Sequence, residues 1–122
     1  MYFMNGRPEP ITEAQVTARL NERDRGRCAV CGCASGVLAI YPRSSVHTSS
    51  PRFDLAGLLL VCGTAVTGCR QWLSNEPGWA RSHGFTVAAH HDPAHVPVEH
   101  AVHGLVLLGH DGAVTPVGEE GA

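Results

Sequence analysis

Two cysteine pairs constrain the fold of this chain more than any other feature. Cys28 and Cys31 have a C-x2-C spacing, Cys62 and Cys69 have a C-x6-C spacing, and thirty residues separate the pairs. Four thiolates from two short-spaced pairs can surround one zinc ion tetrahedrally. Four protein ligands leave no position for water, so the pattern predicts one structural zinc ion per chain rather than a catalytic one.

A fifth cysteine, Cys33, follows Cys31 by two residues. Pairing Cys28 with Cys33 gives C-x4-C, which also suits zinc, so Cys33 is either an alternative ligand or a spare thiol. No basic segment followed by an apolar core opens the sequence, and there is no run of about eighteen apolar residues. We therefore expect no membrane span and a reducing cytoplasm, where clustered cysteines bind metal rather than form disulfides.

Length and charge limit the class of protein. The chain has 122 residues, which predicts one small domain whose core gains support from the metal. The formal net charge of −2 with neutral histidines excludes a strongly basic nucleic-acid-binding protein. Every basic residue is arginine, and none lies beyond Arg81. Any basic surface therefore belongs to the part of the chain before the C-terminal third.

The pattern of local signals predicts an α+β fold. Thr12 and Gln15 fit a capping box at the start of a helix that ends near Arg25, with Val16 and Leu20 on its buried face. Other helices are expected at 69–74 and 77–83. Apolar, β-branched runs predict strands, and an Asp-Gly turn predicts a hairpin. The expected strands are 36–41, 57–61, 85–89, 104–108 and 113–117.

These elements predict four segments along the chain. Residues 1–11 form an irregular lead-in, and residues 12–84 form a zinc-knuckle domain. Residues 85–117 form a β-extension packed on that domain, and residues 118–122 form a disordered tail. Three aromatic residues, Trp72, Trp79 and Phe85, are expected in the core beneath the zinc knuckle, with an interface anchor as the alternative for one of them. Arg23, Arg25 and Arg27 are interpreted either as a solvated face or as part of a basic surface.

The residues around the cysteines resemble the HNH endonuclease family. The run from Arg23 to Gly32 (RDRGRCAVCG) is similar to the start of these domains, and LLLVCG at 58–63, followed by Thr67-Gly68-Cys69 and Trp72, is similar to their continuation. The tail, with Asp-Pro-Ala at 92–94 and Asp-Gly at 111–112, looks like small HNH proteins of phages that infect high-GC Gram-positive bacteria. The resemblance covers roughly residues 15–117.

The resemblance implies a ββα-metal fold, in which a zinc-knuckled hairpin and a helix present a catalytic divalent ion to a phosphodiester. In that family a histidine ending the first strand is the general base, an asparagine opening the second strand orients it, and a histidine after the last zinc cysteine holds the ion. This chain has Ile40 or its neighbours, Gly57 and Arg70 at these places. The departures predict a pseudo-nuclease with no catalytic residues and no catalytic divalent ion.

Other histidines offer two alternatives to this prediction. His47 lies between the first two expected strands, near Asp54, and is a rescue candidate for a relocated nuclease site. The stretch from His90 to His103 contains H-H-D-x-x-H, which can bind a transition metal but is more often a set of surface histidines.

Arginine forks suit phosphate oxygens, so the basic residues near the cysteines predict a nucleic-acid contact. The candidates are Arg27, Arg43, Arg52, Arg70 and Arg81. The first hypothesis is a non-cleaving, HNH-like zinc protein of a phage or prophage that binds DNA or a nucleoprotein in the host cytoplasm, with a packaging motor as one partner that the resemblance implies. The second is a protein-binding module, such as an inhibitor, that contacts a host or phage protein. The third is an active, metal-dependent HNH endonuclease with a relocated site.

Overall fold

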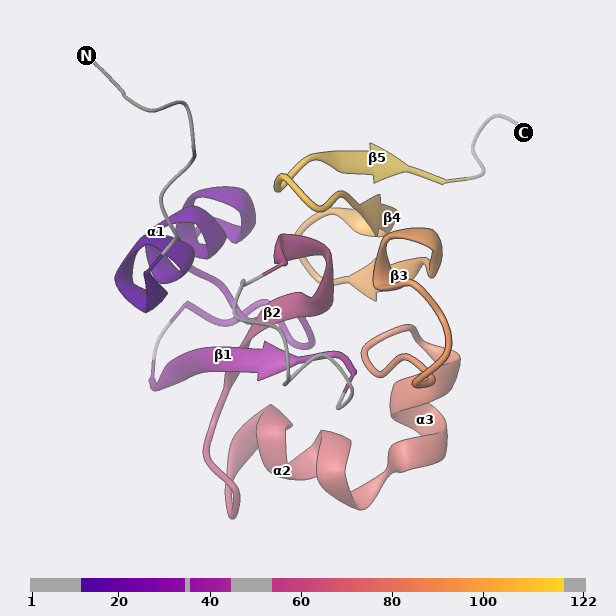
Figure 1. The fold of residues 1–122 in the computed structure, drawn as a ribbon. Coiled ribbons are helices and arrows are strands. Elements are labelled where there is room, and N and C mark those ends of the chain that lie inside the picture. Colours follow the sequence, from indigo (N-terminus) through magenta and orange to yellow (C-terminus); the bar gives the residue numbers. More distant parts are fainter. Residues whose placement is uncertain (1–11, 35, 45–53, 118–122) are drawn as a thin grey trace.

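The computed structural model describes residues 12–34, 36–44 and 54–117, which fold into a mixed α+β arrangement (Figure 1). The helices are α1 (Glu13–Asp24), α2 (Gly68–Asn75) and α3 (Pro77–Ser82), with 3-10 helices η3 (Leu55–Gly57) and η4 (Pro93–His95). The strands are β1 (Leu38–Pro42), β2 (Leu58–Cys62), β3 (Val98–His100), β4 (Gly104–Leu108) and β5 (Val114–Pro116). The mixed α+β class is confirmed. No helix in this part of the chain combines the length and apolarity that crossing a membrane requires.

The predicted capping box opens α1. The Thr12 hydroxyl accepts the backbone N–H of Gln15 at 3.1 Å, and the Gln15 side chain accepts the N–H of Thr12 at 2.8 Å. Val16 and Leu20, one helical turn apart, are both fully buried. The helix ends at Arg25, which adopts the left-handed conformation with φ 60°. These local signals placed the helix correctly.

A two-stranded antiparallel sheet and the helix that follows it position the cysteines. β1 and β2 pair in a register that sets Leu38 opposite Cys62 and Pro42 opposite Leu58. Helix α2 then begins at Gly68, so Cys69 lies in its first turn. Figure 1 shows α2 below this pair of strands and the second sheet above it. The chain therefore contains two antiparallel strands followed by a packed helix.

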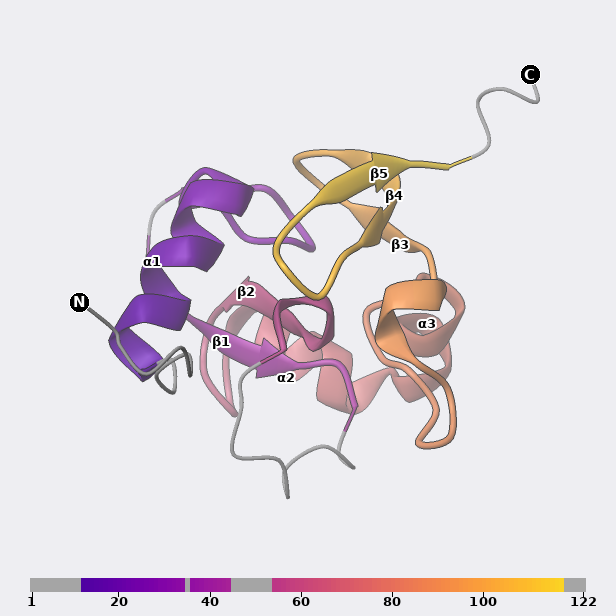
Figure 2. The same ribbon diagram turned by 45° about the horizontal axis from the view of Figure 1, so that its top comes forward.

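The second sheet has the order β3-β4-β5, and each pair is antiparallel (Figure 2). The predicted hairpin at Asp111 and Gly112 is confirmed, because this turn joins β4 to β5. The strand predicted at 85–89 is wrong. Phe85 and Val87 are buried there without a strand partner, and their N–H groups donate to the carbonyls of Ala80 and Arg43.

The largest hydrophobic core draws on both sheets and on the helices between them. Its members include Leu59 and Val61 from β2, Leu73 from α2, and Val98 and Val106 from the second sheet. A smaller core cluster joins α1 to η3 and β2. Of the three aromatic residues expected in the core, Phe85 is buried, Trp79 packs half-buried against it, and Trp72 is 45% exposed. The core placement of Trp72 is therefore wrong, and Trp72 is the one of the three whose exposure leaves the interface-anchor alternative open.

Candidate functional site

The structure brings the four predicted cysteines together in one cluster, which we call the four-cysteine cluster. Sulfur atoms of Cys28, Cys31, Cys62 and Cys69 all lie within 4.8 Å of one another. The Sγ atoms of Cys31 and Cys62 are 3.8 Å apart. Sulfurs bonded at about 2.3 Å to a tetrahedral zinc ion lie about 3.8 Å from each other. The cluster could therefore hold a metal ion, and its dimensions are compatible with zinc.

Backbone donors already surround the buried sulfur of Cys28. Its Sγ accepts the N–H of Val30 at 3.3 Å, of Cys31 at 3.5 Å and of Cys62 at 3.4 Å. Backbone N–H donors around a sulfur are the kind of surrounding contacts that orient a metal-bound thiolate. The environment of Cys28 fits a metal ligand better than an inert core thiol.

Two thiols of the four-cysteine cluster, those of Cys31 and Cys69, resist ionisation when no cation is among them. Burial raises the pKa of Cys31 to about 11, and the neighbouring Cys28 sulfur adds to the rise. Burial also raises the pKa of Cys69, and the charge of Cys28 adds to that effect. A divalent cation at the centre of the cluster would lower these pKa values, because its charge stabilises each sulfur as a thiolate. Metal binding at this place therefore releases protons.

Two glycines close the loop between Cys62 and Cys69. Gly63 has φ +99° and Gly68 has φ +68°. A Cβ at Gly63 would lie 2.2 Å from the carbonyl oxygen of Thr67, and one at Gly68 would lie 2.7 Å from the Cα of Gly63. Only glycine permits such close contact between the two ends of the loop. The glycines are thus the sequence signal for the turn that brings the second cysteine pair together.

Cys33 does not belong to the group of potential metal ligands found among the described residues. Its carbonyl accepts the N–H of Cys28 at 2.9 Å, and the residue is half-buried beside the core. The geometry therefore favours Cys31 over Cys33 as the partner of Cys28.

Two of the three positions at which the HNH resemblance implies catalytic residues are linked by a hydrogen bond. The Nη1 atom of Arg70 donates to the carbonyl oxygen of Ile40 at 3.4 Å, and the guanidinium carbon is 6.0 Å from the centre of the Tyr41 ring. Gly57 is buried in η3. A half-exposed arginine side chain therefore reaches across to β1 directly beside the four-cysteine cluster.

The prediction that Arg43 contacts nucleic acid is wrong, because Arg43 is 1% exposed. Its Nε and Nη2 atoms donate to the carbonyl of Gly84 at 3.0 and 2.8 Å, Nη1 donates to Ala56 and Pro93, and Nη2 donates to Val96. Burial lowers the pKa of the guanidinium to about 10. Arg43 is an internal connector between separate segments of the chain.

The other predicted arginines divide into two groups. Arg27 and Arg81 are exposed, and Arg70 is half-exposed. Arg27 also donates to the carbonyl of Gly32 at 3.1 Å, so its guanidinium lies over the first cysteine turn. Arg52, like the rescue candidate His47, lies outside the described residues. Arg27, Arg70 and Arg81 therefore remain as described candidates for a phosphate contact.

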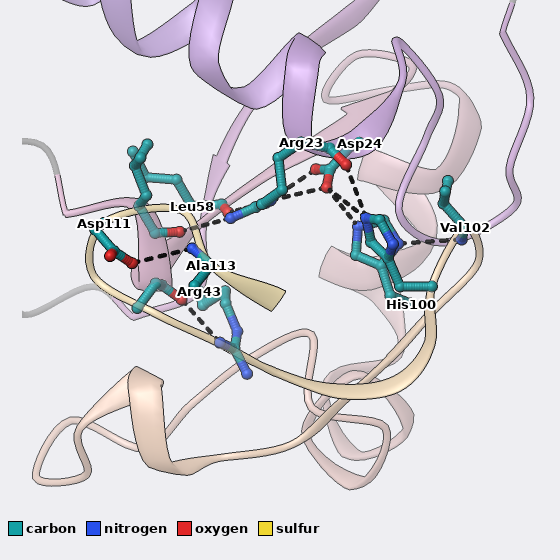
Figure 3. A network of polar contacts seen from close by, with 11 residues as sticks. Arg23, Asp24, Arg43, Leu58, His100, Val102, Asp111 and Ala113 are labelled. Carbon is teal, nitrogen blue, oxygen red and sulfur yellow. Dashed lines mark hydrogen bonds and ion pairs between the residues drawn. The ribbon is translucent and has the colours of Figure 1, made fainter. Parts of the chain in front are cut away.

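A buried polar network at the end of α1 was not predicted. Figure 3 shows the Arg23 guanidinium between the Asp24 carboxylate and the carbonyl of Leu58, with His100 on the other side of Asp24. Arg23 donates to both carboxylate oxygens at 2.8 and 2.9 Å. His100 Nε2 lies 3.1 Å from Asp24 Oδ1, and His103 Nε2 lies 3.6 Å from it. Arg23 is thus part of the interior, not of a solvated face.

Burial opposes ionisation of Asp24, but the close contact with His100 and the hydrogen bonds and charge of Arg23 outweigh it and lower the pKa of the carboxyl. The ligand atoms of Asp24, His100 and His103 are close enough to hold a metal ion. The hydrogen bonds oppose that role. The N–H of Val102 donates to His100 Nδ1, which leaves Nε2 as the protonated nitrogen, and His103 Nε2 donates to the carbonyl of Arg23. Neither Nε2 then offers a lone pair.

The rest of the histidine-rich stretch does not form a metal site within the described residues. His90 and His91 are exposed and contact each other, with ring centres 4.3 Å apart. His95 is exposed and lies 4.0 Å from Asp92. No signal in the sequence marks the separate network around Asp24, because its histidines lie far along the chain: His100 is 76 positions after Asp24.

Comparison with protein-family models, with curated proteins and with solved structures finds no match to this chain. Neither a fold family nor an activity is assigned by similarity.

Proposed function

We propose that this chain is a zinc-binding, HNH-like module that has lost nuclease chemistry and binds DNA or a nucleoprotein without cleaving it. The observation that carries the proposal is Arg70, whose guanidinium reaches β1 beside the four-cysteine cluster. Zinc is the proposed ion because four sulfur ligands at the observed separation suit it. The ion would hold the turn after α1, the end of β2 and the start of α2 together.

The side chains at the three critical positions support loss of cleavage. Ile40 offers only its carbonyl, which accepts the hydrogen bond from Arg70. Gly57 has no side chain with which to orient a base. Arg70 repels a cation and suits a phosphate oxygen, because its guanidinium presents several donors in a fixed plane. A direct phosphate contact is thus the chemistry that these residues favour.

Binding to a protein is the second candidate, and exposed apolar side chains near the cysteines favour it. Val66, in the loop between Cys62 and Cys69, is 72% exposed, and Trp72 on α2 is 45% exposed. Exposed tryptophan is enriched at protein interfaces. Burial of Arg43 also removes one arginine from the proposed phosphate-binding set. A host or phage protein is the kind of partner that this alternative implies.

DNA binding and plasmid cleavage, measured side by side, test the proposal. We expect no cleavage with magnesium, manganese or nickel, and DNA binding that weakens between about 50 and about 200 mM salt. Arg70→Ala should weaken binding several-fold and reduce the slope of log affinity against log salt by about 1, because one phosphate contact is lost. Arg25→Ala, a change at an exposed arginine outside the predicted set, is the matched control.

Three results would contradict the proposal. Cleavage that His47→Ala abolishes would reveal a nuclease with a relocated site. Absence of DNA binding at both salt concentrations would favour the protein-binding alternative. Equal weakening by Arg70→Ala and Arg25→Ala would show that Arg70 has no special role.

A further inference from the structure

His110, in the turn between β4 and β5, lies between two aspartates from other parts of the chain. Its Nδ1 atom is 2.7 and 2.6 Å from the two carboxylate oxygens of Asp54, and its Nε2 atom is 3.5 Å from Asp92 Oδ1. Asp54 caps η3 by accepting the N–H of Ala56 at 3.1 Å. Asp92 caps η4 by accepting the N–H of Ala94 at 3.0 Å. Both carboxylates are therefore held in place independently of His110.

Two carboxylates on opposite sides of one imidazole favour a ring with two N–H groups. The protonated ring can donate to both aspartates, whereas the neutral ring donates to one and presents a lone pair to the other. The hydrogen bond that His110 donates to Asp54 raises the pKa of His110, partial desolvation opposes this, and the charges of Asp54 and Asp92 add to the rise. The backbone N–H of Ala94 lowers the pKa of Asp92 despite some desolvation, and His110 adds to the effect.

Three other charged or titratable side chains lie near His110 without contacting its ring. His95, on η4, lies 4.0 Å from Asp92. Asp111, in the same turn, accepts the N–H of Ala113 at 3.0 Å. Arg43 contacts both 3-10 helices, because its guanidinium donates to the carbonyl of Ala56 in η3 and to the carbonyl of Pro93 in η4. The charged side chains that contact the His110 ring in the described part of the chain are therefore Asp54 and Asp92.

We propose that His110, Asp54 and Asp92 form a pH-sensitive clip, which fastens the β4–β5 turn to η3 and η4 while His110 is protonated and releases it when His110 loses its proton. The clip is independent of the proposed function. A histidine whose pKa is raised on folding stabilises the fold fully below its ordinary pKa of about 6.5, and this stabilisation is lost as the pH rises through the folded value.

Thermal unfolding of His110→Gln and the unchanged protein, at about pH 5.5 and about pH 9, tests the clip on either side of the ordinary histidine pKa. The variant should have the lower Tm at the acidic pH, and the difference should disappear at the alkaline pH. His91→Gln, the same change at an exposed histidine outside the clip, should show no pH-dependent difference. A Tm difference for His110→Gln that is equal at both pH values would overturn the clip.

Titration of the histidine rings by NMR gives a second, independent test. Asp54→Asn keeps an oxygen that can cap η3 but removes the charge, so the pKa of His110 should fall toward the ordinary value of about 6.5. Asp111→Asn, a matched change in the same turn, should leave the pKa of His110 much less altered. A His110 ring that titrates at the ordinary value in the unchanged protein and ignores Asp54→Asn would also overturn the clip.

Discussion

At the scale of single residues, some arginines of this chain are buried and others are exposed, even where they are only four positions apart, as Arg23 and Arg27 are. Arg23 and Arg43 are buried and bind carboxylate or carbonyl oxygens, whereas Arg27 is exposed. The sequence could not separate them, because the acceptors of Arg43 lie 13 to 53 positions away. The four cysteines were predictable because each pair is closely spaced in the sequence and the two pairs together supply the four sulfur ligands that one zinc ion takes. Side-chain burial is decided by the tertiary fold and left no such local signal.

Ionisation of Asp24 should make the free energy of unfolding depend on pH in the acidic range. The pKa of Asp24 is lowered in the folded protein. Its contribution to the unfolding free energy is therefore fully present above the ordinary aspartate pKa of about 3.9 and is lost as the pH falls through the lower pKa of the folded state. Asp24→Asn should cost about 3–5 kcal/mol near neutral pH, because the change leaves the buried Arg23 charge without its partner.

Urea unfolding of both proteins, at matched pH and zinc concentration, measures the loss caused by Asp24→Asn. The difference in unfolding free energy should hold its full size down to about pH 5 and shrink below about pH 4. Asp111→Asn, at an exposed position, is the control. A difference that stays constant across this range would show that ionisation of Asp24 does not contribute to stability.

At the scale of elements, patterns with a local cause were predicted well. The capping box placed α1, and the Asp-Gly turn marked the β4–β5 hairpin. The alternation at 85–89 misled because a buried irregular segment shows the same pattern as a strand. Its backbone donors bind Ala80 and Arg43 rather than a neighbouring strand, and the sequence does not reveal these partners.

Arg43 should be the side chain on which the packing of η3, η4 and the turn at Gly84 depends. Arg43→Ala removes donors from carbonyls in all three places, so it should cost at least about 3 kcal/mol of unfolding free energy. Chemical denaturation measures this cost, with Arg81→Ala as the control at an exposed arginine. A loss below about 0.5 kcal/mol, the usual range for surface changes, would show that these hydrogen bonds do not stabilise the fold.

At the scale of the whole molecule, the four-cysteine cluster joins parts of the chain that share one core. The C-terminal β-extension docks directly behind the first cysteine turn, because the N–H of Ala101 donates to the carbonyl of Ala29 at 2.7 Å. Core residues from both predicted segments pack together, including Leu73 and Val106. Loss of the metal should therefore unfold the second sheet along with the first, in a single cooperative transition.

Elemental analysis of the purified, folded protein tests the central claim most directly, alongside the matched variants Cys69→Ser and Cys33→Ser. The unchanged protein and Cys33→Ser should each carry one zinc ion per chain, while Cys69→Ser should lose zinc and fold poorly, because it removes one of the four sulfur ligands. Zinc chelation should then unfold the unchanged protein. A folded, stable protein that contains no zinc and ignores chelation would contradict the claim that this ion holds the molecule together.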